Sequence, residues 1–350
     1  MIDLGIWLPI FGGWLRNVPD EAMEPTFAYN RRVAEAADAA GFSTMLIAEL
    51  NLNDIKGIDA PSLECWTTAA ALAPLTQRIR IMAALRPGFR QPAVVAKMAA
   101  NIDRMSGGRF EINLVSGWWE EEMKMYAGQW LGHDTRYQRS SEFLEIMKGG
   151  WTRDGFSLDG EFYTTEGLVL EPKPVQTGGP PIYAGGGSEK GRTMIAQNCD
   201  HYLMHGGSVE KIAAAIEDMR ARRADAGHDP DDMRFGMAAY MICRDTEADA
   251  RAEVERITTI DPAAEGYDSY EEFIANSELD SAVDLKDYSV SNRGLRPDLV
   301  GTPAQIEEKL RAYADVGLDL VLVQCSPMLE EVQRIGRDVI PRLQQAAPAS

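Results

Sequence analysis

The sequence predicts one parallel (β/α)8 barrel of the TIM type, an α/β fold that takes in residues 1–350 as a single domain. Short apolar runs rich in β-branched residues alternate with longer segments of helical period, and eight such runs are present. This alternation is typical of strand–helix units that build a parallel sheet. The length suits a single barrel. With 45% hydrophobic and 25% charged residues, the composition is that of an ordinary globular protein.

Four strands and three helices are expected in the first part of the chain. The amphipathic segment 27–40 ends at Gly41, a residue type that commonly closes helices, and Ser106-Gly-Gly closes the helix before the fourth strand. The turn at Arg86-Pro-Gly leads from the third strand into the third helix. The strands are predicted at residues 2–9, 43–49, 78–84 and 110–115, and the helices at residues 27–40, 63–73 and 92–105.

The second part supplies four more strands and two additions to the barrel. After a helix at residues 135–151, a small hairpin appendage is expected around Asp159-Gly160, within residues 156–170. Between helices that start near Thr246 and at Thr302 lies a polar stretch that is too long for an ordinary connection. We expect this insertion, at about residues 257–300, to be a lid before the last helix–strand unit. The strands are predicted at residues 182–184, 202–204, 235–243 and 318–324.

Charge and composition argue against several classes of partner. The formal net charge of −19 disfavours nucleic acids and anionic membranes, because attraction to phosphate needs a basic face. Neither a signal peptide nor an apolar run of about 18 residues is evident, so we expect a cytoplasmic protein. The four cysteines lie far apart and the four histidines lack metal-site spacing, although His201 and His205 are close together. No metal is expected.

Chemistry is expected at the carboxyl ends of the strands, where the active sites of such barrels lie. Tyr183-Ala-Gly-Gly-Gly-Ser188 joins a strand to a helix start, whose N–H groups can bind phosphate; the alternative is a capped turn without a ligand. The segment from Asn113 to Trp119 offers an amide and two indoles, which suits a flat flavin ring, unless the indoles simply cover the barrel mouth. No hydrolytic triad or carboxylate pair stands out, so a cofactor should carry the reaction.

Five motifs spread over nearly the whole chain jointly resemble those of the bacterial-luciferase-like flavin monooxygenases, in the branch of the alkanesulfonate, dimethyl sulfone and pyrimidine oxygenases. The motifs are Arg86-Pro-Gly with residues 92–97, Ile102-Asp-Arg-Met-Ser-Gly-Gly-Arg-Phe110, Asn113-Leu-Val-Ser-Gly-Trp118, His133-Asp-Thr-Arg-Tyr137 and Leu299-Val-Gly-Thr-Pro303.

The resemblance implies a two-component enzyme and a set of flavin contacts. Reduced FMN would come from a separate NAD(P)H:FMN reductase and form a C4a-(hydro)peroxide with O2, in a protein that is a homo-oligomer, either a dimer or a tetramer. Asn113 is implied as a catalytic residue whose amide supports the oxygenated flavin, and Arg293 as the catalytic arginine of the lid. The implied FMN contacts are Glu49, Leu50, Asn113, Glu122, Arg136, Tyr137 and Ser188.

Departures from the alkanesulfonate oxygenases indicate a neutral substrate. Where those enzymes carry an arginine and a histidine, this chain has Ala238 and Tyr240, and Ser326 replaces an active-site tyrosine. A desolvated anion needs charged partners. Among small organosulfur compounds such as a sulfone or a sulfonate, we therefore expect a sulfone. The expected walls of its site are Trp7, Trp14, Trp118, Met204 and Tyr240.

Three other functions remain open on the sequence. The same scaffold could oxygenate a heterocyclic or chlorinated aromatic compound. A deazaflavin-dependent dehydrogenase shares the barrel and moves hydride without oxygen, but its cofactor has an acidic tail, which suits a chain of net charge −19 less well. A flavin-binding protein without catalysis is the alternative from a different class.

Overall fold

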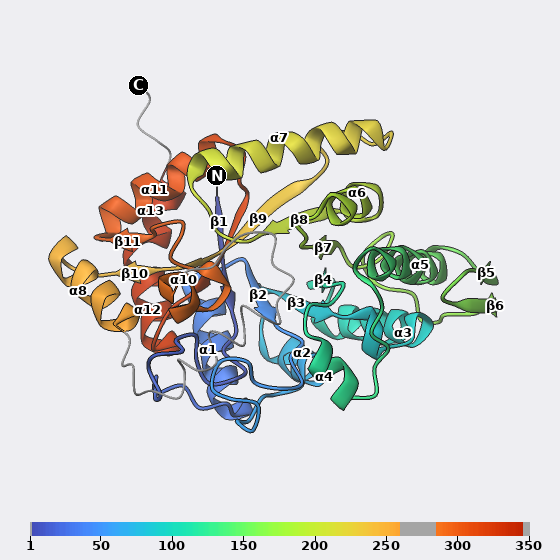
Figure 1. Ribbon diagram of the computed structural model, residues 1–350, viewed down its shortest axis with the longest axis horizontal. Helices are drawn as coiled ribbons and strands as arrows, with labels where there is room; N and C mark the ends of the chain where they lie inside the picture. The colour runs from blue at the N-terminus through green and yellow to red at the C-terminus, as the bar shows by residue number, and fades with distance from the viewer. Residues whose placement is uncertain (1, 260–284, 346–350) are drawn as a thin grey trace.

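The computed structural model describes residues 2–259 and 285–345 and confirms the barrel. Eight parallel strands close in the order β1-β12-β9-β8-β7-β4-β3-β2 (Figure 1). Closure occurs where β1 pairs with β12, with Asp3 beside Leu320 and Ile6 beside Val323. The strands are β1 Asp3–Trp7, β2 Thr44–Ile47, β3 Arg80–Leu85, β4 Phe110–Leu114, β7 Ile182–Ala184, β8 His201–Met204, β9 Arg234–Tyr240 and β12 Leu320–Gln324.

Helices cover the outside of the barrel (Figure 1). α1, Phe27–Ala40, has the predicted bounds: the Thr26 hydroxyl accepts the N–H of Tyr29 at its start, and Gly41 ends it in the left-handed conformation, with a φ of 90°. The other helices are α2 Cys65–Leu72, α3 Pro92–Ser106, α4 Glu120–Met125, α5 His133–Thr152, α6 Glu189–Asn198, α7 Val209–Asp225, α8 Glu247–Thr258, α10 Leu285–Ser289, α11 Pro303–Asp315, α12 Met328–Asp338 and α13 Ile340–Gln344, with 3₁₀ turns η1 Ala73–Leu75, η2 Pro87–Phe89 and η3 Ser291–Arg293.

The inside of the barrel is filled by side chains from alternate strand positions. Its middle is an apolar cluster of Leu46, Met82, Tyr183, Leu203, Leu320 and Leu322, against which Trp7 packs. Because side chains alternate along a strand, Gln324 points to the same side as Leu322. Asn113 pairs in register with Tyr183, and Tyr240 pairs with Gln324, so both also point inward. We call the layer formed by Trp7, Asn113, Tyr240 and Gln324, at the carboxyl end of the strands, the barrel floor.

Two elements differ from the sequence prediction. The strand expected at residues 235–243 breaks at Met241: β9 stays in the barrel, whereas β10, Ile242–Cys243, leaves it to pair with β11, Val300–Gly301. Helix α4 lies between the strand predicted at residues 110–115 and the helix predicted at residues 135–151, where no element was expected. The hairpin is confirmed as β5, Phe156–Asp159, and β6, Thr164–Leu168.

The insertion lies between α8 and α11, as predicted, and its residues 260–284 are outside the described part. The described part, from α10 onward, packs onto the loop that follows β1. Leu15 and Val290 form an antiparallel bridge, and the Ser291 N–H donates to the Trp14 carbonyl at 2.9 Å. Val290 and Ser291 are buried. This end of the expected lid is therefore fixed to the rim of the barrel. Within the described residues, no helix is long and apolar enough to cross a membrane.

Candidate active site

Buried ion pairs join the loops that follow β2 and β3. We call Glu49, Glu64, Arg86, Arg90 and Glu122 the arginine clasp. Glu122, on α4, is fully buried, and both of its oxygens contact Arg86, with Nη2 donating to Oε1 at 2.7 Å. The N–H of Asn51 donates to the same Oε1 at 2.6 Å. The Glu122 carboxylate thus ties α4 to both loops.

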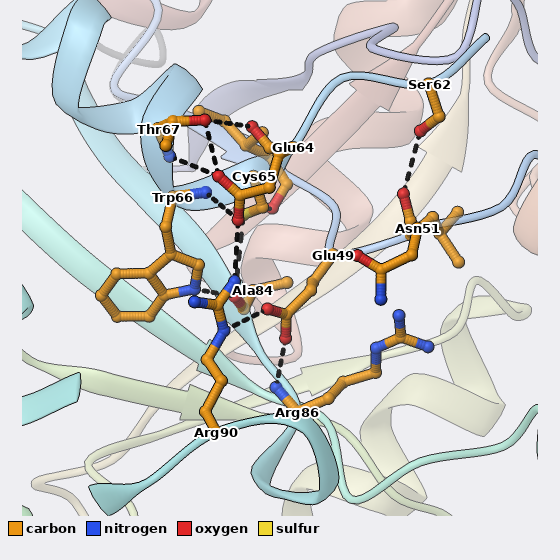
Figure 2. Close-up of polar contacts among 12 residues, drawn as sticks. Glu49, Asn51, Ser62, Glu64, Cys65, Trp66, Thr67, Ala84, Arg86 and Arg90 are labelled. Carbon is orange, nitrogen blue, oxygen red and sulfur yellow. Dashed lines mark hydrogen bonds and ion pairs between the residues drawn. The ribbon is translucent and has the colours of Figure 1, made fainter. Parts of the chain in front are cut away.

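Glu49 forms the second half of the clasp (Figure 2). One oxygen accepts the backbone N–H of Arg86 at 2.5 Å, and the other accepts Nε of Arg90 at 2.5 Å. Arg90 also donates to Glu64 at 2.7 Å, so its guanidinium lies between two carboxylates. Burial acts to lower the pKa of Arg90, but the carboxylates of Glu49 and Glu64 outweigh burial and raise it. The arginine therefore stays charged.

Three of the predicted flavin contacts belong to this region. The oxygens of Glu49 and Glu122 all have protein partners. The carbonyl of the half-buried Leu50 accepts the Ser62 hydroxyl at 2.9 Å. These residues thus shape the edge of the barrel mouth, and their contact with flavin stays a prediction.

The predicted phosphate end comes together at the start of α6. Ser188 caps this ten-residue helix, and its hydroxyl accepts the N–H of Gly191 at 3.1 Å. Tyr137, on α5, reaches the same turn: a Cβ at Gly191 would lie 2.8 Å from the Tyr137 hydroxyl and 3.1 Å from Ser188 Oγ, so a larger residue there would displace the Tyr137 ring. Two hydroxyls and the N–H groups of a helix start are the usual components of a phosphate site.

Arg136, the residue before Tyr137 on α5, is buried rather than solvated. It is 3% exposed, Nη1 donates to the Leu131 carbonyl at 2.8 Å, and the guanidinium carbon lies 4.2 Å from the ring centroid of Trp130. A buried cation of this kind attracts an anion strongly. Its contact with phosphate stays a prediction.

The barrel floor has a different character from the clasp. Asn113 is 6% exposed and Gln324 is 0% exposed. Within the described residues, Oδ1 of Asn113, both amide atoms of Gln324 and Nε1 of Trp7 are buried and have no hydrogen-bond partner. Buried polar atoms in native proteins nearly always have partners. Because these side chains also point inward at the carboxyl ends of the strands, we interpret these atoms as ligand-directed.

An aromatic wall stands over the β1 side of the floor. The ring centroids of Trp14 and Trp7 are 6.0 Å apart, and Phe11 lies edge-on to Trp14 at 5.1 Å. The loop is held by Glu21, whose Oε1 accepts the N–H of Trp14 at 2.8 Å and pairs with Lys56 Nζ at 2.7 Å. The indole Nε1 of Trp14 is buried and has no partner among the described residues.

A glycine turn at a helix start, an amide on the floor and an aromatic wall thus share one end of the barrel. A model of the family described as luciferase-like monooxygenase matches residues 3–320. The chain belongs to the luciferase-like monooxygenase family.

Two named proteins are similar to this chain over almost its full length. The chain is 36% identical over 355 aligned positions to an FMNH(2)-dependent dimethylsulfone monooxygenase of Pseudomonas putida, covering 98% of this chain and 96% of that protein. It is 34% identical to the protein of the same name from Pseudomonas fluorescens strain Pf0-1, covering 98% and 95%. The crystal structure of DmoA from Hyphomicrobium sulfonivorans shares the fold, with a TM-score of 0.81 at 18% identity over 98% of this chain and 88% of that one.

The remaining predicted site residues lie at or after the ends of other strands or belong to the insertion. Trp118 is half-buried and stacks on Trp119, with ring centroids 5.5 Å apart. Met204, at the end of β8, and Tyr240, at the end of β9, are buried. The backbone of Arg293 belongs to η3, but its side chain lies outside the described residues, so its catalytic role stays a prediction.

The two neighbouring histidines do not form a joint site. His201 begins β8 and therefore lies at the amino end of the barrel, whereas His205 follows the end of that strand. The His201 ring accepts the N–H of Arg234 at 3.2 Å, and burial lowers its pKa to about 4. It is a neutral structural residue. No group of three or more potential metal ligands occurs among the described residues.

Sequence reasoning missed the side chains that organise the mouth, above all Gln324, Glu21 and the arginines of the clasp. One signal for Gln324 was present, because it is the single polar residue that ends the apolar strand Leu-Val-Leu-Val-Gln. Glu21 gave no comparable signal, since it lies in an irregular loop.

Proposed function

We propose that this chain is the oxygenase component of a two-component system, which uses reduced FMN from a separate NAD(P)H-dependent reductase and O2 to oxygenate a small sulfone. The observation that carries the proposal is the full-length similarity, at 34% and 36% identity, to two proteins named FMNH(2)-dependent dimethylsulfone monooxygenases. The geometry of the barrel mouth supports it.

The residues around the mouth fit an FMN molecule. The phosphate would lie against the start of α6, with hydroxyls from Ser188 and Tyr137 beside it. The flavin ring would extend toward the floor, where Oδ1 of Asn113 is buried and unpartnered in the described structure. A ring N–H is the kind of donor that this oxygen needs.

Reduced FMN bound there would supply two electrons, so that one oxygen atom of O2 enters the substrate and the other leaves as water. The described floor side chains, Trp7, Asn113, Tyr240 and Gln324, are uncharged at neutral pH. Burial raises the pKa of Tyr240 further, which keeps its phenol protonated. These residues position and enclose the reactants without acting as acids or bases, and the burial of Asn113, Tyr240 and Gln324 keeps water away.

The chemistry of a sulfone defines the expected products. Its sulfur has no lone pair left, so the oxygen atom must enter a C–H bond beside the sulfur. The resulting α-hydroxy sulfone breaks its C–S bond, releasing a sulfinate and an aldehyde. With dimethyl sulfone, each turnover consumes one O2 and one FMNH2 and gives methanesulfinate, formaldehyde, water and FMN, which balances in atoms and electrons.

The test is a product assay with the purified chain, FMN, a flavin reductase, NADH and O2. We expect formaldehyde and methanesulfinate in equal amounts from dimethyl sulfone, and none when the chain or O2 is left out. The panel also contains a methanesulfonate, a heterocycle and a chlorinated phenol, and a parallel assay supplies a deazaflavin cofactor and an alcohol without O2. Turnover of one of these in place of the sulfone would overturn the proposal.

A further inference from the structure

The β1 side of the mouth lies across the barrel from the phosphate end. In the closed strand order β1-β12-β9-β8-β7-β4-β3-β2, four steps in either direction separate β1 from β7, the strand that leads to Ser188. A flavin whose phosphate lies at β7 and whose ring lies near Asn113 on β4 leaves the β1, β12 and β9 side for the substrate. Trp7, Gln324 and Tyr240 end these three strands.

Three buried N–H donors on this side have no partner among the residues that the structure describes. They are Nε1 of Trp7, Nε1 of Trp14 and Nε2 of Gln324, and none has a hydrogen bond within the described residues. Trp14 and Gln324 are each 0% exposed. A buried donor without an acceptor costs free energy. Three of them on neighbouring elements point to a ligand that carries hydrogen-bond acceptors.

Strand pairing and backbone hydrogen bonds fix the positions of the three donors. On one side of β12, Gln324 pairs in register with Tyr240 of β9. On the other side, Val323 pairs with Ile6 of β1, so the next residues along the two strands, Gln324 and Trp7, lie side by side. Trp14 is fixed at both of its backbone groups, because its N–H donates to Glu21 and its carbonyl accepts the N–H of Ser291.

Among the described side chains, the charges around the donors disfavour an anion. Lys56 is paired with Oε1 of Glu21, and Arg16 is paired with Asp54 at 3.1 Å. Oε2 of Glu21 is buried without a partner among the described residues. Burial is the main cause of the raised pKa of Tyr240, and the carboxylates of Glu21, Glu253 and Glu331 raise it further, so negative potential reaches this side of the floor.

We propose that Trp7, Trp14 and Gln324 form the subsite that binds the two sulfonyl oxygens of a neutral sulfone, and that they set the selectivity for it. This inference rests on the proposed function. Each sulfonyl oxygen accepts hydrogen bonds, so two oxygens can satisfy three uncharged N–H donors. A sulfide offers the donors no oxygen, and a sulfonate brings a negative charge next to Glu21. The subsite therefore selects against both.

The experiment compares three variants that remove one donor each while keeping bulk: Trp7→Phe, Trp14→Phe and Gln324→Leu. For each variant that folds, we expect KM for dimethyl sulfone to rise about tenfold or more, the size expected for one lost buried hydrogen bond. FMN affinity, measured by fluorescence quenching, should stay within twofold of wild type. The ratio of dimethyl sulfone to dimethyl sulfide turnover should fall by a similar factor.

The matched control is Trp151→Phe, on α5 outside the barrel. There the indole Nε1 donates to the Ala96 carbonyl at 2.9 Å, so loss of the donor should lower stability and leave KM and the selectivity ratio unchanged. If the wild-type enzyme oxidises dimethyl sulfone and the three variants keep its KM and selectivity ratio, the subsite is overturned but the proposed function is not. A large loss of FMN affinity would also overturn the subsite, because the donors would then face the flavin. Failure of the wild-type enzyme to oxidise any sulfone would instead overturn the proposed function.

Discussion

The arginine clasp and the barrel floor are both buried and polar, yet they treat hydrogen bonds in opposite ways. In the clasp, the oxygens of Glu49 and Glu122 are taken by arginines and backbone N–H groups. On the floor, the amides of Asn113 and Gln324 are left incomplete in the described structure. The carboxylates of the clasp are satisfied and contribute to the fold, although Nε of Arg86 is buried without a partner in the described structure, whereas the floor amides cost stability until a ligand completes them. Substitutions in the clasp should therefore affect stability first, and substitutions on the floor should affect function first.

The largest effect is expected from Glu122→Ala, which leaves the Arg86 guanidinium buried without its carboxylate. Loss of one partner from a buried pair costs about 3 to 5 kcal/mol. The free energy of unfolding in urea should fall by that amount. Glu120→Ala on the same helix removes only an exposed pair with Lys124, and should change it by less than about 0.5 kcal/mol. If Glu122→Ala kept its stability and bound FMN more weakly, Glu122 would be a cofactor ligand, and the clasp would not differ from the floor in the way described.

Asn113→Ala should show the reverse profile. Its Oδ1 has no partner in the described structure, so removal should hardly lower the melting temperature. Loss of a positioned amide in a closed site can cost about 3 kcal/mol of barrier, or about a hundredfold in kcat. Asn101→Ala, at an exposed position of α3, is the control for substitution of an asparagine. If the melting temperature and kcat of Asn113→Ala fell in parallel, the amide would have a structural role like that of the clasp.

Ser188→Gly separates helix capping from phosphate binding. Glycine replaces serine as an N-cap at a cost of only a few tenths of a kcal/mol, so the melting temperature should change little. The Kd for FMN should rise about tenfold, because a hydroxyl beside the phosphate is lost. Ser208→Gly is a matched control, since Ser208 caps α7 in the same way, with its hydroxyl accepting the N–H of Lys211. Equal, small changes of Kd in both variants would limit Ser188 to capping.

The smallest effect concerns His201, a polar residue at the other end of the barrel. Because burial lowers its pKa to about 4, the unfolded chain takes up a proton below pH 6.5 and the folded chain does not. Stability should thus fall as pH falls from 7 to 5, by about 1 kcal/mol once partial exposure is allowed for. His201→Asn, which keeps an acceptor, should remove this part of the pH dependence without affecting turnover at pH 7. The exposed His228, replaced by Gln, is the control. A loss of turnover in His201→Asn at pH 7 would contradict this prediction, because it would show that a residue at the amino end of the barrel affects the site at the carboxyl end.

Local sequence signals predicted the regular elements well because the causes of those elements are local. The bounds of α1 follow from an amphipathic period and a glycine that takes a φ of 90°. The break at Met241 could not be predicted, because it depends on distant partners: the N–H of Tyr240 donates to the Gly294 carbonyl and that of Met241 donates to the Gln324 carbonyl. Helix α4 was missed because it is six residues long and has no side-chain cap.

The candidate site was predictable only in part, for a related reason. Family motifs led to Asn113, Tyr137 and Ser188, and the structure brings the last two to one turn. The state of a hydrogen bond cannot be inferred from a motif, since it depends on every neighbour in space. The sequence therefore could not show that the oxygens of Glu49 and Glu122 already have protein partners, and Gln324 did not stand out as a ligand contact.

The parallel pairing of residues 3–6 with residues 320–323 has a consequence for biosynthesis. The strand that ends at Trp7 leaves the ribosome before the other barrel strands, and it must wait for β12, the last of them, before its second edge is covered. Pairings between such distant parts of a chain form slowly, and an uncovered strand edge invites aggregation in the meantime. Because β12 carries Gln324 as its final residue, the nascent chain completes its sheet and gains this amide in the same step.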